Sequence, residues 1–302
     1  MALNRAQFTK QLNLGLNTVF GMEYDRYPEQ WRAIYSTEQS MKAFEEDVQM
    51  IGFGEAPTKA EGAMITYENG REGYVARYVH ETVALAFSIT EEAEEDGLYG
   101  SLGAKYARAL ARSMQHTKEI KGANVLNNAT TTSTGGDGVS LLSASHPTGG
   151  GSTQSNTLAT AADLSETSLE TLLIQISEAK DDREIPIALI GQKLICPPEL
   201  LFVAERVLNS NLRPGTADND INAVKALGMI PGGVVVNQRL TDADQWFIGT
   251  DCPDGMKHFV RAPIKKAVEG DFGTGNLRYK TRERYSFGFT DWRGIYGTEG
   301  AA

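Results

Sequence analysis

Histidine and cysteine are the side chains through which this chain could most directly bind a metal. The four histidines and two cysteines stand apart from one another, at His80, His116, His146, His258, Cys196 and Cys252. Zinc sites place such ligands at short intervals, as in CxxC or HxxxH, and neither spacing occurs in this sequence. Each histidine is therefore expected to be a structural or solvated side chain, and both cysteines to be ordinary thiols.

The glycine-rich and acidic motifs lack the residues that their chemistry requires. TGGGST is not followed by Gly-Lys-Ser/Thr, GDFGTG departs from the order G-x-G-x-x-G, and no G-x-S-x-G presents a nucleophilic serine. Asp218 and Asp220 lack the glycine and terminal glutamate of a calcium-binding loop. Glu91 and Glu92 are expected to be solvated charges at the start of a helix. We therefore expect no catalytic residue, no cofactor and no metal site.

Composition and charge narrow the class of protein. With 302 residues, 41% of them hydrophobic and 23% charged, the chain is long enough for one large folded domain or two modest ones. Its net charge of −10 disfavours a dedicated nucleic-acid reader and binding to an anionic membrane. The sequence has no stretch of ~20 apolar residues and no signal-peptide pattern at its start, so synthesis in the cytoplasm is expected.

Basic residues are concentrated near the C-terminus. The 47 residues from Met256 hold nine basic and five acidic side chains, a local charge of +4 in an acidic chain. Within them LRYKTRERYSFGF alternates with the period of a β-strand. One face of this strand carries what we call the basic ladder, Arg278, Lys280, Arg282 and Arg284. The ladder is interpreted either as a solvated face paired with local acids or as a row facing a neighbouring subunit or packed DNA.

The first ninety residues predict an arm and a hairpin. Helical spacing followed by Tyr24, Trp31 and Tyr35 indicates an aromatic arm that docks on another surface, and a helix is expected over 37–50. Asn69-Gly70, followed by Arg71, is typical of a tight turn between strands at 63–67 and 73–88. This hairpin has little local sheet to join, so we expect a partner strand from another chain.

A long helix and a mixed module follow. Ser88 and Glu91 fit a capping box, and apolar spacing predicts a helix over about 99–127, on the order of 40 Å long. A polar Gly/Ser/Thr-rich segment then crosses the surface. Ser165 and Pro198 mark the starts of two helices, and KLICPP, GGVVVNQRL and QWFIG are expected strands, so this part predicts an α+β module.

The order of these elements resembles that of the major capsid proteins of tailed bacteriophages with the Hong Kong 97-type fold. YVARYVHETVALAFSITEEAEEDGLYG is similar to the return strand of the family's extended loop (E-loop) leading into its spine helix. DGVSLLSASHPTGGGSTQSN with LSETSLETLLIQI resembles a segment of Mu-like head subunits, and KLICPPELLFVAERVLNS with INAVKALG and VVVNQRLTDADQWFIG resembles their axial domain.

The resemblance implies an α+β fold with five parts. These are an N-terminal arm at 1–55, an E-loop at 56–88, a peripheral (P) domain at 89–162 that contains the spine helix, an axial (A) domain at 163–258, and returning P-domain strands at 259–302. It further implies a structural protein that self-assembles into pentamers and hexamers of an icosahedral shell around double-stranded DNA. Portal, separate scaffold and decoration proteins are implied partners, with non-specific DNA contact and no membrane.

Within this interpretation, subunit contacts are expected at the hairpin turn and the basic ladder, namely Asn69, Gly70, Arg71, Arg278, Lys280, Arg282 and Arg284. Two alternatives remain: a nanocompartment shell of the same fold, and an α+β enzyme with an unrecognised site. An extended subunit should expose much more surface than the roughly 12,500 Å² of a compact monomer of this mass.

Overall fold

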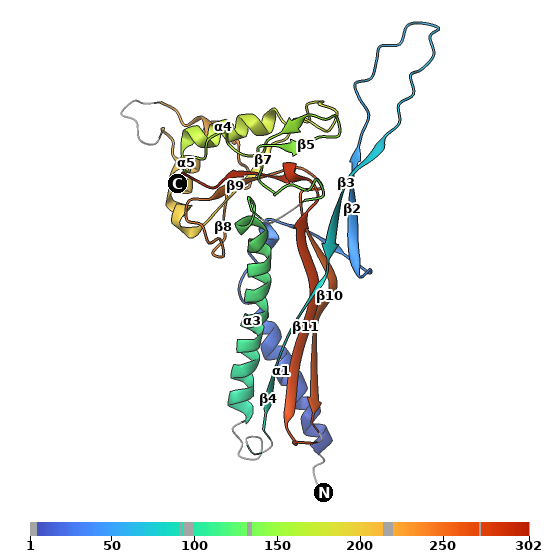
Figure 1. The fold of residues 1–302 in the computed structure, drawn as a ribbon. Helices are drawn as coiled ribbons and strands as arrows, with labels where there is room; N and C mark the ends of the chain where they lie inside the picture. The colour runs from blue at the N-terminus through green and yellow to red at the C-terminus, as the bar shows by residue number, and fades with distance from the viewer. Residues whose placement is uncertain are drawn as a thin grey trace.

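The computed structural model describes residues 5–90, 92, 99–131, 135–213, 220–271 and 273–301. It shows a long stalk, a compact head at one end of the stalk and a loop that projects beside the head (Figure 1). The helices and 3₁₀ turns are α1 (Arg5–Tyr24), η1 (Trp31–Ala33), α3 (Tyr99–Asn127), α4 (Glu166–Ser177), η2 (Pro198–Leu200), α5 (Leu201–Asn209), α6 (Ala223–Leu227) and η3 (Trp292–Gly294).

Strands occur in the stalk, in the head and at the base of the projecting loop. They are β1 (Ser36–Gln39), β2 (Phe44–Ile51), β3 (Arg71–Val79), β4 (Glu81–Ile89), β5 (His146–Pro147), β6 (Thr153–Gln154), β7 (Gly191–Cys196), β8 (Val234–Val236), β9 (Trp246–Thr250), β10 (Met256–Gly270), β11 (Leu277–Phe289) and β12 (Ile295–Thr298).

The stalk is a four-stranded sheet covered on one face by two helices. The sheet has the order β1-β10-β11-β4, with β1 parallel to β10 and the remaining pairs antiparallel. The inward face of β11 packs against α1 and α3. There the ring of Phe20 lies 6.4 Å from that of the buried Tyr279, and small residues such as Ala107 and Ala111 bring the two helices together. The alternation of LRYKTRERYSFGF is confirmed, because Tyr279, Thr281 and Tyr285 are buried.

The head is built on a second four-stranded sheet, β12-β9-β7-β8, with α4, α5 and α6 around it. The cap predicted at Ser165 is confirmed, since its hydroxyl accepts from the Ser168 amide. Strands form at the three expected sites, and Pro198 starts η2 immediately before α5. The last strand, β12, pairs with β9 and therefore belongs to the head sheet, not to the returning stalk strands.

The first ninety residues differ from the expectation. The predicted helix over 37–50 is wrong: β1 and β2 form there, because pairing with β10 and β3 outweighs local helix propensity. The predicted strand 63–67 is irregular, and β3 pairs with β2 of the same chain, so no second chain is needed to complete it. Ser88 lies in β4 opposite Arg278 and does not cap a helix, while Glu91 lies outside the described residues.

The segment that crosses between stalk and head is held by a buried polar network. His146 is fully buried and stacks on Trp292 with ring centroids 4.3 Å apart. Its Nδ1 lies 2.6 Å from a carboxylate oxygen of Asp137, and its Nε2 lies 3.2 Å from Oδ1 of Asn156. The Asn156 amide donates to the carbonyl oxygens of Leu141 and Ile295. This network joins the crossing segment to the C-terminal strand.

The folded chain is extended, as expected. Its accessible surface is 17089 Å², against about 12,500 Å² for a compact monomer of the same mass. No helix in the described parts of the chain is long and apolar enough to cross a bilayer.

Replacing Asn156 with Ala should lower the free energy of unfolding by on the order of 2–4 kcal/mol, because several buried partners of the amide would be left unpaired. Asn128→Ala is the matched control, since the Asn128 amide donates to one exposed carbonyl, that of Asn124. Urea unfolding followed by circular dichroism measures both variants. Equal stability of the two would contradict the role of the network.

Candidate functional site

The projecting loop spans 52–70 and extends the β2-β3 pair away from the body (Figure 1). Asn69 and Gly70 lie on its returning side, directly before β3, and Gly70 does not have a positive φ. The tight turn predicted at Asn69-Gly70 is therefore wrong. Gly62 instead has φ +77°, and the amide of Ala63 donates to the carbonyl of Ala60 at 3.1 Å, which places the turn at 60–63.

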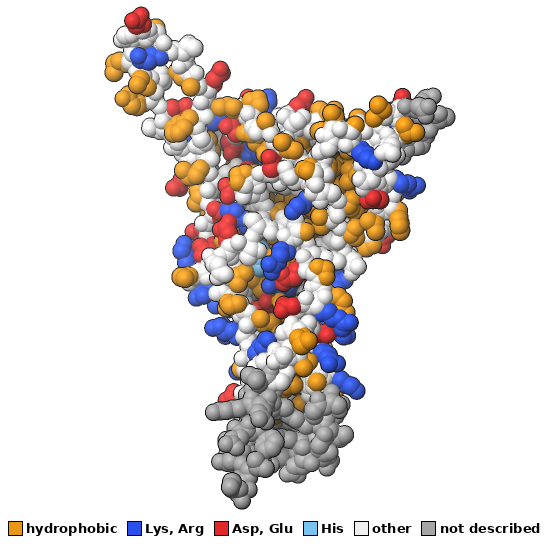
Figure 2. Space-filling model, turned by 180° about the vertical axis from the view of Figure 1, so that it is seen from behind, with side chains coloured by type: hydrophobic (Ala, Val, Ile, Leu, Met, Phe, Trp, Pro, Cys, Tyr) orange, Lys and Arg blue, Asp and Glu red, His pale blue; other side chains and the backbone are white. Residues whose placement is uncertain are grey.

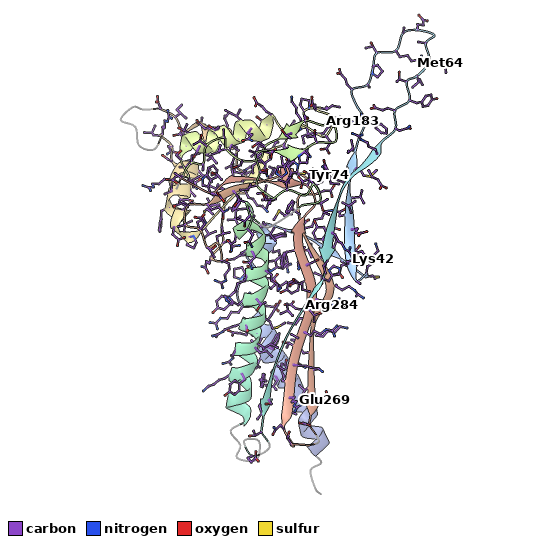
Figure 3. All side chains as sticks on the ribbon, viewed as in Figure 1. Lys42, Met64, Tyr74, Arg183, Glu269 and Arg284 are labelled. Atoms are coloured by element: carbon purple, nitrogen blue, oxygen red, sulfur yellow. The ribbon has the colours of Figure 1, made fainter. Side chains whose placement is uncertain are left out.

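The base of this loop is tied to the body by polar contacts. Glu68 accepts a hydrogen bond from the Gly54 amide at 2.8 Å and forms an ion pair with Arg183 at 3.1 Å. Arg183 lies at the base of the loop (Figure 3). Arg71 donates to the carbonyl of Gly149. Lys257 of β10 is 5% exposed and forms ion pairs with three carboxylates, those of Asp47 on β2, Asp254 and Glu38.

The far end of the loop carries exposed apolar side chains. Met64 is 88% exposed, Tyr67 87% and Ile65 66%, and Met64 lies near the far end of the loop (Figure 3). Phe53, at the start of the loop, is also exposed. We call Met64, Ile65 and Tyr67 the loop tip. Large apolar side chains gathered on a projection gain free energy only when another surface covers them.

The basic ladder lies on the outward face of the stalk sheet. Arg278, Lys280 and Arg282 are exposed and Arg284 is half-buried. Arg278 forms an ion pair with Asp271 at 2.5 Å. Within the described residues Lys280 and Arg282 have no ion pair, and Arg282 lies directly opposite Lys265 on β10. Like charges across a strand pair repel, so this face favours a partner that brings negative charge.

The aromatic arm is anchored to the chain's own stalk. The Glu119 carboxylate on α3 accepts from the amides of Gln30 at 2.8 Å and Trp31 at 3.2 Å, and the Tyr35 hydroxyl donates to the Gly122 carbonyl at 2.7 Å. The surface on which the arm docks therefore belongs to its own chain, and Trp31 and Tyr35 are buried there without a neighbouring molecule.

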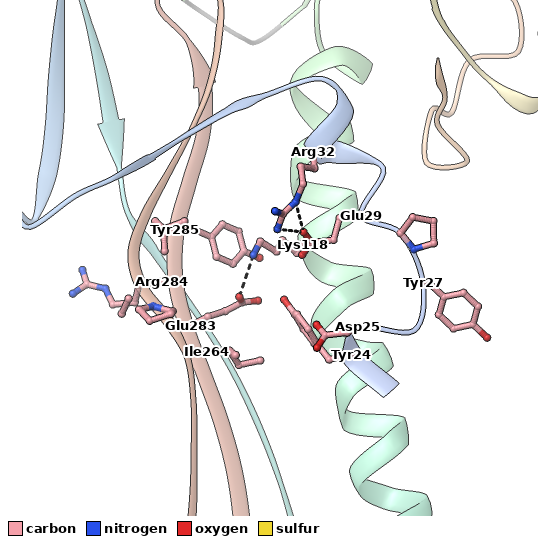
Figure 4. Close-up of a pocket in the computed structure, with 14 residues that line it drawn as sticks. Tyr24, Asp25, Tyr27, Glu29, Arg32, Lys118, Ile264, Glu283, Arg284 and Tyr285 are labelled. Carbon is pink, nitrogen blue, oxygen red and sulfur yellow. Dashed lines mark hydrogen bonds and ion pairs between the residues drawn. The ribbon is translucent and has the colours of Figure 1, made fainter. Parts of the chain in front are cut away.

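A cavity of about 440 Å³ remains between the end of α1, the middle of α3 and strands β10 and β11 (Figure 4). Lys118 and Glu283 form an ion pair across it at 3.6 Å, and Arg32 pairs with Glu29. Burial raises the pKa of Glu283 although Lys118 opposes the shift. The Lys118–Glu283 pair joins α3 to β11, and the Arg32–Glu29 pair lies within the arm.

His258 lies beneath the arm, between two aromatic rings. Its ring centroid is 4.3 Å from that of Trp31 and 4.4 Å from that of Phe287. Burial, aided by the nearby cations Lys118 and Arg32, lowers the pKa of His258 to about 3. Its Nε2 is buried and has no hydrogen-bond partner within the described residues. This imidazole is therefore neutral and structural at pH 7.

The sequence did not identify the buried cations Lys257 and Arg293 as important. Arg293 pairs with Asp182 at 3.1 Å and with Asp291 at 3.3 Å, and Gln49 of β2 donates to Asp182 at 3.1 Å. Asp182, Asp47 and Glu38 are distant in the chain from the cations that they pair with, so spacing gives no signal for these contacts. In the parts of the chain that the structure describes, no three His, Cys, Asp or Glu side chains are placed to hold a metal ion.

Solved structures share this arrangement of stalk, head and projecting loop. The capsid of the cyanophage P-SCSP1u aligns with a TM-score of 0.56 at 12% identity, covering 89% of this chain and 86% of that chain. The capsid of an empty GTA particle aligns at 0.55 and 13%, covering 91% and 90%. A virus-like particle from Pyrococcus furiosus aligns at 0.54 and 13%, covering 94% and 98%. The fold is thus that of the Hong Kong 97-type capsid proteins.

The sequence family agrees with the fold. A family model described as phage capsid protein matches residues 74–298, which is most of the chain. The chain therefore belongs to the phage capsid protein family, and it is a structural major capsid protein. No curated protein matches its sequence. The narrower resemblance to Mu-like head subunits stays a prediction.

His258 should make the folded chain less stable in acid. Its pKa is about 3 when folded and about 6.5 when unfolded, so the unfolded state binds the extra proton between these values. The contribution of His258 to the free energy of unfolding is complete above pH 6.5 and is lost as the pH falls toward 3. The loss from this group is at most about 1.4 kcal/mol per pH unit.

The change His258→Gln should make the free energy of unfolding less dependent on pH between 6.5 and 4, whatever its effect at pH 7. His116→Gln, which changes an exposed histidine on α3, is the control variant. Chemical denaturation at a series of pH values measures both. An unchanged slope in the His258 variant would show that its protonation is not coupled to folding.

Proposed function

We propose that copies of this chain assemble into the pentamers and hexamers of an icosahedral phage head that encloses double-stranded DNA. Assembly takes place in the host cytoplasm, and the finished protein resides in the virion. The subunit acts through its surfaces and not through catalysis. Its partners are other copies of itself, a portal, a separate scaffold and decoration proteins, and it contacts the packaged DNA without sequence specificity and has no membrane partner.

The observation that carries this proposal is the projecting loop with its apolar tip. The subunit exposes 17089 Å², well above the value for a compact monomer, and Met64 and Tyr67 are almost fully exposed far from their own core. A monomeric protein gains nothing from such a projection, whereas a shell subunit can cover the tip with its neighbour.

We assign the parts of the chain to capsid regions with the domain boundaries predicted from the sequence, and we change one of them. The arm covers 1–55 and the E-loop 56–88, with β2 completing the base of the E-loop. The P-domain takes 89–162 and the returning strands from 259, and the A-domain takes 163–258. Because β12 pairs with β9, we place 295–298 in the A-domain.

The loop tip is tested by Met64→Asp combined with Tyr67→Asp. These side chains touch little of their own chain, so the free energy of unfolding should change by less than about 0.5 kcal/mol. Burying two carboxylates at a subunit contact should reduce the yield of particles by more than tenfold in electron micrographs.

Met41→Asp is the control for this variant, because Met41 is 91% exposed but lies outside the loop tip. It should assemble like the original chain. Normal particle yield in the double variant would show that the loop tip makes no assembly contact, and absence of particles from the unaltered chain would overturn the proposed function itself.

The basic ladder, together with Asn69, Gly70 and Arg71 at the loop base, provides our proposed subunit contacts. Reversing Arg282 to Glu should leave the monomer folded, since the new carboxylate faces Lys265 across the strand pair. If the ladder meets carboxylates of a neighbour, particles of this variant should dissociate more easily than those of the unaltered chain.

The difference should be largest at low salt, because exposed charges are screened over about 10 Å at 0.1 M ionic strength. Light scattering across a salt series measures dissociation. Lys42→Glu is the control, because it reverses the charge of an exposed lysine that lies outside the basic ladder and pairs with Glu45 of its own chain. Particles equally stable at every salt concentration would argue against an electrostatic contact through Arg282.

A nanocompartment shell is the second candidate, because the virus-like particle from Pyrococcus furiosus matches almost the whole chain in fold. The contents of purified particles separate the two. Nuclease-protected double-stranded DNA supports the phage head, and a stoichiometric protein cargo without DNA supports the nanocompartment.

A further inference from the structure

The outer face of α3 carries a row of basic side chains. Lys105, Arg108, Arg112 and His116 are all exposed and follow one another at intervals of three or four residues. This spacing places them on one face of a helix, over about 16 Å of its length. Figure 2 shows Lys and Arg side chains along the edges of the stalk.

This row is only partly neutralised by the described residues around it. The segment from Tyr99 to Lys118 contains no Asp or Glu, although the chain as a whole has a net charge of −10. Arg112 pairs with Glu23 at 2.6 Å through Nε. Within the described residues Lys105 and Arg108 have no ion pair. The helix face is therefore a local positive region on an acidic subunit.

A groove continues the row toward the head. Its volume is about 770 Å³, and its lining includes Arg112, His116 and Arg239. The amide side chains of Gln30 and Gln238 lie in the same lining. Glu119, the acid in this lining, accepts hydrogen bonds from the backbone amides of Gln30 and Trp31. Cationic and amide donors around a groove suit phosphate and sugar oxygens.

The helix face and the basic ladder lie on opposite sides of the stalk. α1 and α3 cover the inward face of the sheet, while Arg278, Lys280 and Arg282 are on its outward face. In a shell one subunit thick, only one of these two faces can line the interior. The ladder is partly neutralised, because Arg278 pairs with Asp271 and lies opposite Glu269.

We propose that the outer face of α3, from Lys105 to His116 with the groove at Arg239, lines the interior of the shell and binds the phosphate backbone of packaged double-stranded DNA. This assignment rests on the proposed function of a DNA-enclosing head and specifies which surface meets the DNA. The face offers no base-reading arrangement, so the contact is independent of sequence. At physiological salt, charges farther than about 8 Å are largely screened, so the local positive region outweighs the net charge of the subunit.

The test measures the affinity of the full-length, unassembled chain for a fluorescent DNA duplex by anisotropy over a salt series. Each phosphate contact contributes about −0.9 to the slope of log affinity against log salt. Lys105→Gln combined with Arg108→Gln should therefore make the slope shallower by about 2. Lys280→Gln combined with Arg282→Gln removes the same charge from the ladder and should leave the slope unchanged.

Three results would overturn the assignment: no DNA binding by the unaltered chain, an unchanged slope in the helix variant, or an equal loss in the ladder variant. Electron microscopy of the same preparations keeps the two proposals distinguishable. If the helix variant forms shells normally and binds DNA like the unaltered chain, this inference is refuted and the proposed function stands. Fewer shells from the helix variant with unchanged DNA binding would identify the face as a site for a scaffold protein instead, which also refutes it.

Discussion

The antiparallel pairing of β10 and β11 is the interaction on which the rest of the subunit depends. These strands run side by side from Met256↔Phe289 at the head to Gly270↔Leu277 at the far end of the stalk. Their outer edges receive β1 and β4, and one face supports α1 and α3. Every other part of the stalk is thus positioned by this pair, and its upper end passes directly into the buried core of the head through Phe289 and Trp292.

Buried ion pairs then fix the projecting loop to this frame. Burial by itself would lower the pKa of Lys257, but hydrogen bonds to Asp47 and Asp254 outweigh burial and raise it. The pKa of Asp47 is lowered, since Lys257 and Thr290 outweigh its own partial burial. Removing one partner of such a pair leaves an uncompensated buried charge, which is far more destabilising than losing an exposed pair. The direction in which the loop leaves the body is therefore set inside the subunit, before any neighbour is present.

A stiff frame with uncovered projections suits a shell protein. The arm is secured by Glu119 on α3, while Met64 and Tyr67 at the loop tip have little contact with their own chain. Symmetric assembly multiplies each weak surface contact over many identical interfaces. Small contributions at the loop tip and the basic ladder are thus sufficient for our proposed assembly, provided that the frame holds them in one geometry.

The sequence by itself determined the elements whose residues obey a local rule. The alternation around Tyr279 and Thr281 defined β11, the apolar spacing defined α3, and Ser165 marked the start of α4. Only the tertiary structure decided that 44–51 is a strand and that Gly62, not Gly70, forms the turn of the loop. It also decided the partners of Lys257 and Arg293. Strand pairing joins residues that are distant along the chain, and so do the pairs of Lys257 with Asp47 and of Arg293 with Asp182. These interactions depend on residues outside the local segment and therefore leave no periodic signal in the sequence.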